Sequence, residues 1–188
     1  MKKKVVVWGT GNVGRPAIRA VLSHAELELV GVIVSNDAKV GRDAGELAGV
    51  APVGVTATKD AGSVLTADVD AVVYAASADI RPDEAMADLL QCLFAGCNVV
   101  STSFYDFLHP ALVPEDAMAK VAAATNAGSS SLFVSGIDPG PHSAWGVAIN
   151  GGSAPWADAV CTPRKIDARH TDTNRAANER SRSSIARA

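Results

Sequence analysis

Several features that mark large protein classes are scarce in this sequence of 188 residues. The three cysteines, Cys92, Cys97 and Cys161, have spacings that fit neither a metal site nor a disulfide framework. No apolar run approaches the length that crosses a membrane. The net charge of -3 gives no basic excess of the kind that attracts nucleic acid. We therefore expect a cytoplasmic protein with reduced thiols, no metal site, and neither a membrane nor nucleic acid as its partner.

The clearest motif lies near the N-terminus. A β-branched run ends at Trp8 and leads directly into the pattern G-x-G-x-x-G, formed by Gly9, Thr10, Gly11, Asn12, Val13 and Gly14. In a dinucleotide-binding turn, the first glycine allows the tight turn, the second lets a pyrophosphate approach the backbone, and the third lets the helix pack closely. Free amides at the helix start favour an anion. A glycine-rich turn without a ligand is the alternative interpretation.

Strand-like and helix-like apolar patterns alternate through the first 140 residues. We expect strands at residues 4–8, 27–34, 54–58, 70–75, 98–102 and 131–137. We expect helices directly after the glycine motif and at residues 43–47, 82–96 and 114–128. Alternating βα units of this length predict an α/β fold, a Rossmann-type doubly wound parallel sheet with helices on both faces. Residues 1–140 are thus predicted to form an NAD(P)-binding domain.

The residues that follow the second predicted strand bear on the choice of coenzyme. An acid at this position usually binds the ribose hydroxyls, whereas a small polar residue with a nearby arginine suits the 2′-phosphate of NADP. Ser35 and Asn36 stand here, and Lys39 or Arg42 is placed to pair with a phosphate, which favours NADP over NAD. Asp37 argues the other way, and the two basic side chains are alternatively solvated loop charges.

Three segments resemble a known family. The glycine loop, the run 40–49 and the run 54–56 resemble the N-terminal domain of dihydrodipicolinate reductases, and look closer still to 2,4-diaminopentanoate dehydrogenases and NAD(P)-dependent amine dehydrogenases. Residues 98–102 and 136–140 fit the same relatives. The resemblance implies NADP or NAD as coenzyme, hydride transfer involving a C=N or C=C bond of a small substrate, and a homo-oligomer.

The resemblance also implies which residues face the nicotinamide. Ser101 and Thr102 match positions that face the ring, and Ala76 and Ser77 line the expected crevice. Hydroxyls that bond the local backbone at a strand end are the alternative for the first pair. The adjacent histidine pair of the reductases is absent from this sequence, so no catalytic residue is assigned.

Residues 141–188 differ in composition from the rest. They contain no leucine and are rich in arginine, alanine and serine, so we expect an irregular, poorly structured tail. One hypothesis is that an out-of-frame segment replaces the substrate domain of the relatives, and another is a basic tail that contacts nucleic acid or an acidic partner. The alternative function is accordingly a non-catalytic NAD(P)-binding module or an inactive truncated fragment.

Overall fold

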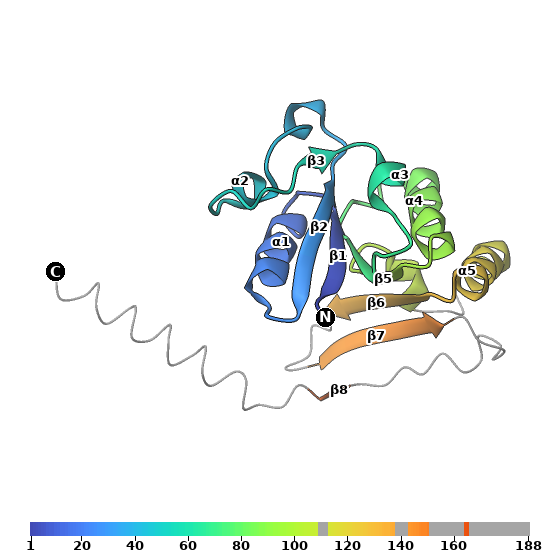
Figure 1. Cartoon of the computed structure of the whole chain (residues 1–188). Helices are drawn as coiled ribbons and strands as arrows, with labels where there is room; N and C mark the ends of the chain where they lie inside the picture. The colour runs from blue at the N-terminus through green and yellow to red at the C-terminus, as the bar shows by residue number, and fades with distance from the viewer. Residues whose placement is uncertain (109–112, 138–142, 151–163, 166–188) are drawn as a thin grey trace.

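The chain folds around one sheet flanked by helices (Figure 1). The computed structural model describes residues 1–108, 113–137, 143–150 and 164–165. The strands are β1 (Lys3–Trp8), β2 (Leu27–Ile33), β3 (Ala57–Thr58), β4 (Ala71–Tyr74), β5 (Asn98–Ser101), β6 (Ser131–Ile137), β7 (Ser143–Asn150) and β8 (Arg164–Lys165). The α-helices are α1 (Gly14–Ser23), α2 (Ala44–Ala48), α3 (Ala61–Val64), α4 (Pro82–Phe94) and α5 (Glu115–Gly128). Two 3₁₀ turns are η1 (Asp37–Lys39) and η2 (Tyr105–Leu108).

The sheet has the strand order β3-β2-β1-β4-β5-β6-β7-β8. Strands β1 to β6 pair in parallel, and the order reverses direction at β1, which lies between β2 and β4. This is the doubly wound Rossmann arrangement, in which ligands bind at the carboxyl ends of the strands where the order reverses. The prediction of a Rossmann-type α/β fold is therefore confirmed.

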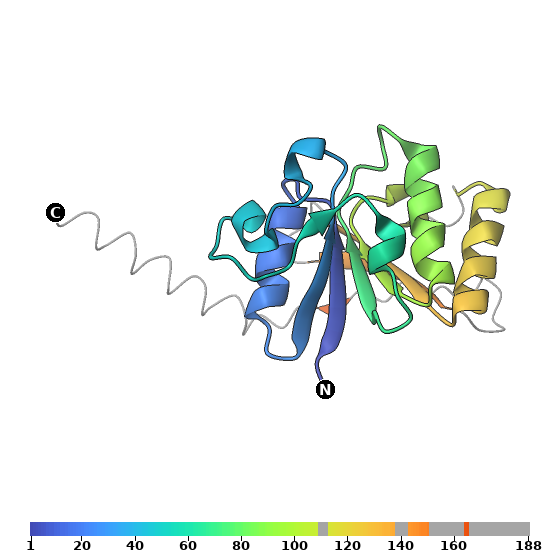
Figure 2. The ribbon, with the colours of Figure 1, turned by 45° about the horizontal axis from the view of Figure 1, so that its top comes forward.

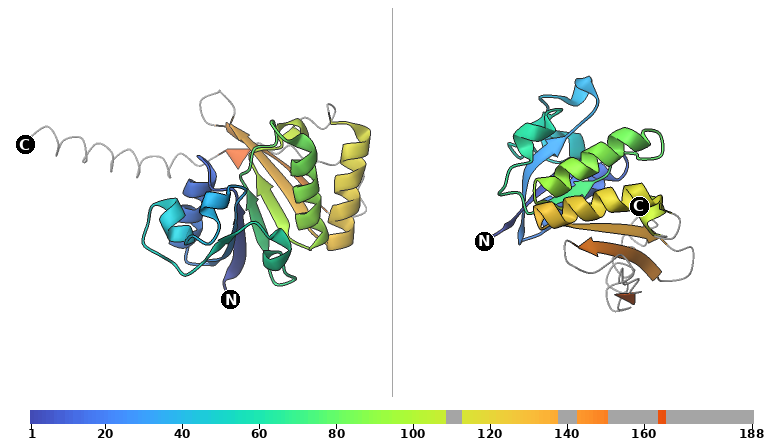
Figure 3. Two further views of the ribbon diagram at one scale, coloured as in Figure 1. Left: turned by 90° about the horizontal axis from the view of Figure 1, so that it is seen from above. Right: turned by 90° about the vertical axis from the view of Figure 1, so that its right-hand side faces the viewer.

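Helices cover the sheet on two sides. Seen from above, α1 and α2 lie on one side of the sheet, and α4 and α5 lie on the other (Figure 3). Within β1, Val5 and Val7 belong to the core beneath α1, whereas Val6 and Trp8 belong to the core beneath α4 and α5. Both sets are buried, so the continuous apolar run of β1 reflects a strand that is covered on both faces. Helices α4 and α5 pack side by side (Figure 2).

Local sequence signals explain where the helices begin and end. Pro82 stands in the first turn of α4, where its missing N–H costs nothing. Asp43 caps α2 by accepting a hydrogen bond from the Gly45 amide, and Gly49 ends that helix in the left-handed region. The short helix α3 was not predicted from the sequence. No helix among the described residues is long and apolar enough to cross a membrane.

Strand β7 requires a correction of the sequence analysis. Residues from 141 onward were expected to be irregular, but Ser143–Asn150 form a strand that pairs antiparallel with β6, and β8 pairs antiparallel with β7. The alternation of Trp145, Val147 and Ile149 with small residues is a strand pattern that the sequence analysis overlooked. The remainder of the predicted tail lies outside the described residues.

Candidate functional site

The register of the parallel strands brings the candidate residues to one edge of the sheet. Trp8 at the end of β1 pairs with Ile33 of β2 and with Tyr74 of β4, and Tyr74 pairs in turn with Ser101 of β5. The residues that follow each of these strand ends therefore lie along the same carboxyl edge. They comprise the glycine turn, Ser35 and Asn36, Ala76 and Ser77, and Thr102.

The three glycines of the turn differ in the space that a side chain would find at each position. Gly9 adopts a φ of 104°, and a Cβ there would lie 2.9 Å from the backbone of Ala75 and Ala76. A Cβ on Gly14 would lie 1.9 Å from the Gly9 carbonyl oxygen, so the helix packs directly onto the turn. By contrast, a Cβ on Gly11 would meet no atom of the described residues within 4 Å. Gly11 is thus not required by packing within the chain, and its open side leaves space for a ligand.

The start of α1 carries the electrostatic features of an anion site. Val13 precedes the helix without a side-chain cap, and the first turn contains no acidic residue. The turn itself is held by two backbone bonds, from the Gly9 amide to the Ile33 carbonyl at 2.8 Å and from the Arg15 amide to the Gly11 carbonyl at 3.1 Å. Helix amides that point out of such a start attract a phosphate.

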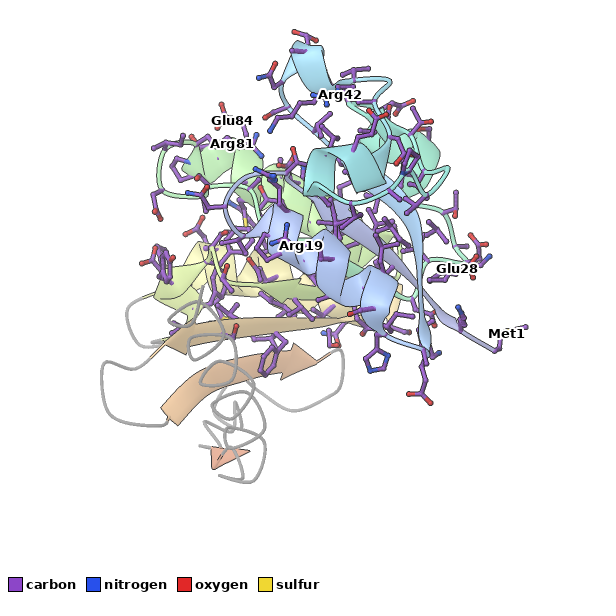
Figure 4. The ribbon with its side chains drawn as sticks, turned by 90° about the vertical axis from the view of Figure 1, so that its left-hand side faces the viewer. Met1, Arg19, Glu28, Arg42, Arg81 and Glu84 are labelled. Carbon is purple, nitrogen blue, oxygen red and sulfur yellow. The ribbon has the colours of Figure 1, made fainter. Side chains whose placement is uncertain are left out.

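The segment after β2 contains the residues predicted to select the coenzyme. Ser35, Asn36 and Arg42 are all exposed, and Arg42 lies on the segment between η1 and α2 (Figure 4). The Asn36 side-chain oxygen accepts a hydrogen bond from the Ala38 amide at 2.9 Å, so this residue caps η1. Asp37, the acidic residue that would favour NAD, forms an ion pair with Lys59 at 2.6 Å.

Lys39 connects this segment with the glycine turn. Its ammonium donates hydrogen bonds to the Thr10 carbonyl at 3.1 Å and to the Thr10 hydroxyl at 3.0 Å. From the sequence, Lys39 is expected to pair with a phosphate or to be a solvated loop charge. In the structure the side chain is partly buried and places its positive charge beside the turn.

The residues expected near the nicotinamide differ in their environments. Ser77 is exposed, and Ala76 and Thr102 are half-buried. Ser101 is buried, and its hydroxyl donates to the Tyr74 carbonyl at 3.0 Å and accepts from the Ser103 amide at 3.0 Å. The alternative of a hydroxyl that bonds local backbone therefore describes Ser101, because its only donor is already used. The placement of Ser101 at the coenzyme stays a prediction.

A polar cluster that the sequence analysis missed lies beside this part of the edge. The hydroxyl of Tyr74 donates to the Asp88 carboxylate at 2.9 Å and accepts from the Arg81 guanidinium at 3.0 Å, and Arg81 also pairs with Asp88. Burial raises the pKa of the Tyr74 phenol, so it stays protonated. The only local signal for the cluster is the spacing of Arg81, which precedes α4, and Asp88 within α4. That spacing does not indicate that Tyr74 of β4 takes part.

The described residues contain no cluster of three histidine, cysteine or acidic side chains that could hold a metal ion. Cys92 and Cys97 are buried free thiols, and burial raises the pKa of each. The chemistry of the edge is thus that of backbone amides, hydroxyls and basic side chains, which suits phosphate and ribose groups.

Comparison with known proteins agrees with this geometry. Residues 3–104 match the family described as dihydrodipicolinate reductase, N-terminus. The chain is 53% identical over 142 residues to an amine dehydrogenase of Streptomyces virginiae, a match that covers 75% of this chain and 38% of that protein. It is 41% identical over 71 residues to a 4-hydroxy-tetrahydrodipicolinate reductase of Colwellia psychrerythraea, covering 37% and 26% of the two chains. The chain thus spans well under half the length of these relatives.

Solved structures show the same similarity. The amine dehydrogenase of Mycobacterium smegmatis superposes with a TM-score of 0.62 at 27% identity, over 70% of this chain and 38% of that one. A dihydrodipicolinate reductase from Paenisporosarcina sp. shares the fold, with a TM-score of 0.52 at 15% identity over 71% and 47% of the chains. Because the family match covers more than half of its residues, the chain belongs to the dihydrodipicolinate reductase N-terminal family, a family of NAD(P)-dependent oxidoreductases.

Proposed function

We propose that this chain is the coenzyme-binding part of an NAD(P)-dependent oxidoreductase that transfers a hydride to the C=N bond of a small substrate or, in reverse, removes a hydride from the amine carbon and forms that bond. The observation that carries the proposal is the glycine turn, where Gly9 and Gly14 are demanded by packing and Gly11 is not. The similarity to an amine dehydrogenase supports a C=N bond, because oxidation of an amine at its carbon yields an imine. A C=C bond is the second substrate class that fits the family.

Each part of the edge would hold one part of the coenzyme. The amides from Gly11 to Gly14 suit the pyrophosphate, because they lie at a helix start with no acid in its first turn. The ribose of the adenosine half would contact Ser35, Asn36 and Arg42. The absence of a carboxylate at position 35 favours NADP, whose 2′-phosphate lies on this ribose. The bound coenzyme would donate or accept the hydride, and this chain's residues would bind and orient the coenzyme.

The nicotinamide end would lie between the segments that follow β4 and β5. Ala76, Ser77 and Thr102 offer a small apolar surface and two hydroxyls at this place. Ser101 would act indirectly, because its hydrogen bonds to Tyr74 and Ser103 join the ends of the two strands. Hydride transfer also requires the substrate carbon to be held against the ring in a near-attack geometry.

Calorimetry with NADP, NAD and their reduced forms tests the proposal directly. We expect binding of the nicotinamide coenzymes, with NADP preferred over NAD. Absence of measurable coenzyme binding would refute the proposal, and a clear preference for NAD would refute its NADP part.

The second candidate function is coenzyme binding without catalysis. It is favoured by the chemistry of the described edge, where we assign no proton donor among the glycines, alanine and hydroxyls. Tight coenzyme binding without any turnover across amines and unsaturated substrates would support this second function over the first.

A further inference from the structure

The segment between β4 and α4, residues 75–80, contains two of the residues proposed to meet the nicotinamide. Tyr74 is the last residue of β4, and Arg81 immediately precedes α4. The two residues therefore flank the segment, and their side chains meet, with the Arg81 guanidinium 3.0 Å from the Tyr74 hydroxyl. This hydrogen bond joins the two ends of the segment.

The surroundings strengthen this hydrogen bond. Tyr74 is fully buried, and its ring packs between Trp8 at 5.6 Å and Phe104 at 5.2 Å between ring centroids. The side chains of Arg81 and Asp88 are only 30% and 18% exposed. Charged partners in a poorly solvated place make stronger hydrogen bonds than neutral partners in water.

The Tyr74 hydroxyl is the connecting element of this cluster. Arg81 immediately precedes α4 and Asp88 lies within that helix, so their ion pair does not reach β4. The bonds of the hydroxyl to both charged groups tie α4 to β4. Removal of the Tyr74 hydroxyl would remove these hydrogen bonds between α4 and β4 and leave Arg81 and Asp88 paired with one another.

The beginning of the same loop is held independently. The Ala75 amide donates to the Trp8 carbonyl at 2.7 Å, and the backbone of Ala75 and Ala76 packs against Gly9. The first residues of the loop are therefore attached to the glycine turn. The far end, which leads into α4, is held by the bond from the Arg81 amide to the Ala78 carbonyl at 3.3 Å and by the side-chain cluster.

We propose that Tyr74 and Arg81, with Asp88, form a clamp that positions the loop of residues 75–80 against the nicotinamide half of the coenzyme. This inference rests on the proposed function, since it assumes a nicotinamide coenzyme at this edge. The three are positioning residues, because none of them is placed in contact with the reacting atoms. The clamp acts through Ala76 and Ser77, which it holds at the carboxyl edge of the sheet.

Tyr74→Phe tests the clamp, because it removes the hydroxyl and keeps the ring in its aromatic packing. Hydrogen exchange of peptides that cover residues 75–81 is expected to accelerate severalfold, with exchange in β1 and α5 unchanged. Affinity for NADPH should fall about fivefold, as expected for the loss of one hydrogen bond, whereas affinity for 2′-phospho-ADP-ribose should stay within about twofold. 2′-Phospho-ADP-ribose is a fragment of NADPH that lacks the nicotinamide half.

Further variants sharpen the test. Arg81→Lys keeps the positive charge at the clamp and should therefore retain more of the NADPH affinity than Arg81→Ala. Lys120→Ala removes an exposed ion pair with Asp116 on α5 and should change neither exchange in the loop nor the affinity ratio. The clamp is overturned if loop exchange is unchanged in Tyr74→Phe, or if both probes lose affinity equally. If the parent protein binds neither probe, the proposed function fails while the exchange measurement still decides the clamp.

Discussion

The Lys39 ammonium donates hydrogen bonds to both the carbonyl and the hydroxyl of Thr10, at 3.1 and 3.0 Å. One side chain therefore connects η1, which follows β2, with the glycine turn, which follows β1. The bond also places a positive charge next to the amides proposed to bind the pyrophosphate. Thr10 is only 7% exposed, so this connection is shielded from water on the threonine side.

Substitution of Lys39 tests whether this charge serves the coenzyme. Lys39→Gln keeps a donor but removes the charge, and we expect the affinity for NADP to fall about tenfold, in line with the loss of one charge-assisted contact. Calorimetry at low and high salt provides the check, because the difference between variant and parent should shrink as salt screens the phosphates. An unchanged affinity for NADP at low salt would limit Lys39 to a structural role.

The glycine turn allows a contrast between two substitutions. Gly11→Val adds a branched side chain into open space, so the fold should persist while coenzyme affinity is lost. Gly14→Ala places a Cβ 1.9 Å from the Gly9 carbonyl, so it should destabilise the protein itself. Thermal unfolding and calorimetry on both variants separate the two effects. A Gly11→Val protein that binds coenzyme like the parent would contradict the placement of the pyrophosphate.

The coenzyme preference is expected to respond to Ser35. Ser35→Asp adds an acceptor for the ribose hydroxyls and a charge that repels a 2′-phosphate, so the ratio of NADP to NAD affinity should fall by at least about tenfold. Ser35→Asn is the matched control, because asparagine is close to aspartate in size but carries no charge. This variant should leave the ratio of NADP to NAD affinity nearly unchanged. Titration of each variant with both coenzymes gives the ratio.

Asp43 is expected to make the stability depend on pH. Hydrogen bonds from the backbone amides of Val53, Gly54 and Gly45 lower the pKa of this carboxyl below 3.8. Because the folded-state pKa is the lower one, its stabilisation is complete well above 3.8 and is lost as the pH falls through the folded-state value. Asp43→Asn should therefore lower the unfolding temperature at neutral pH, and the difference from the parent should shrink in acid.

Thermal unfolding between neutral and acidic pH measures this dependence. Glu26→Gln, at an exposed position in the turn between α1 and β2, serves as the control and should keep the pH profile of the parent. A difference between Asp43→Asn and the parent that stays constant at every pH would show that the carboxylate charge is not what the loop requires.

Local chemistry made much of the fold predictable from the sequence. The β-branched runs of β1 and β2, the glycines after β1, and Pro82 at the start of α4 each act through the backbone of their own neighbourhood. Parallel strands then align their carboxyl ends, so the residues after β1, β2, β4 and β5 lie along one edge. The family resemblance, confirmed over residues 3–104, rests on the same local motifs.

The tertiary structure decided which side chains meet across that edge. Lys39 reaches Thr10 over 29 positions of sequence, and Ser101 reaches the Tyr74 carbonyl over 27. Such contacts depend on strand register and on the rotation of each element, which no local pattern encodes. Strand β7 was missed for a different reason. Its alternation of apolar and small residues is a local strand pattern, but the composition of residues 141–188 favoured an irregular tail.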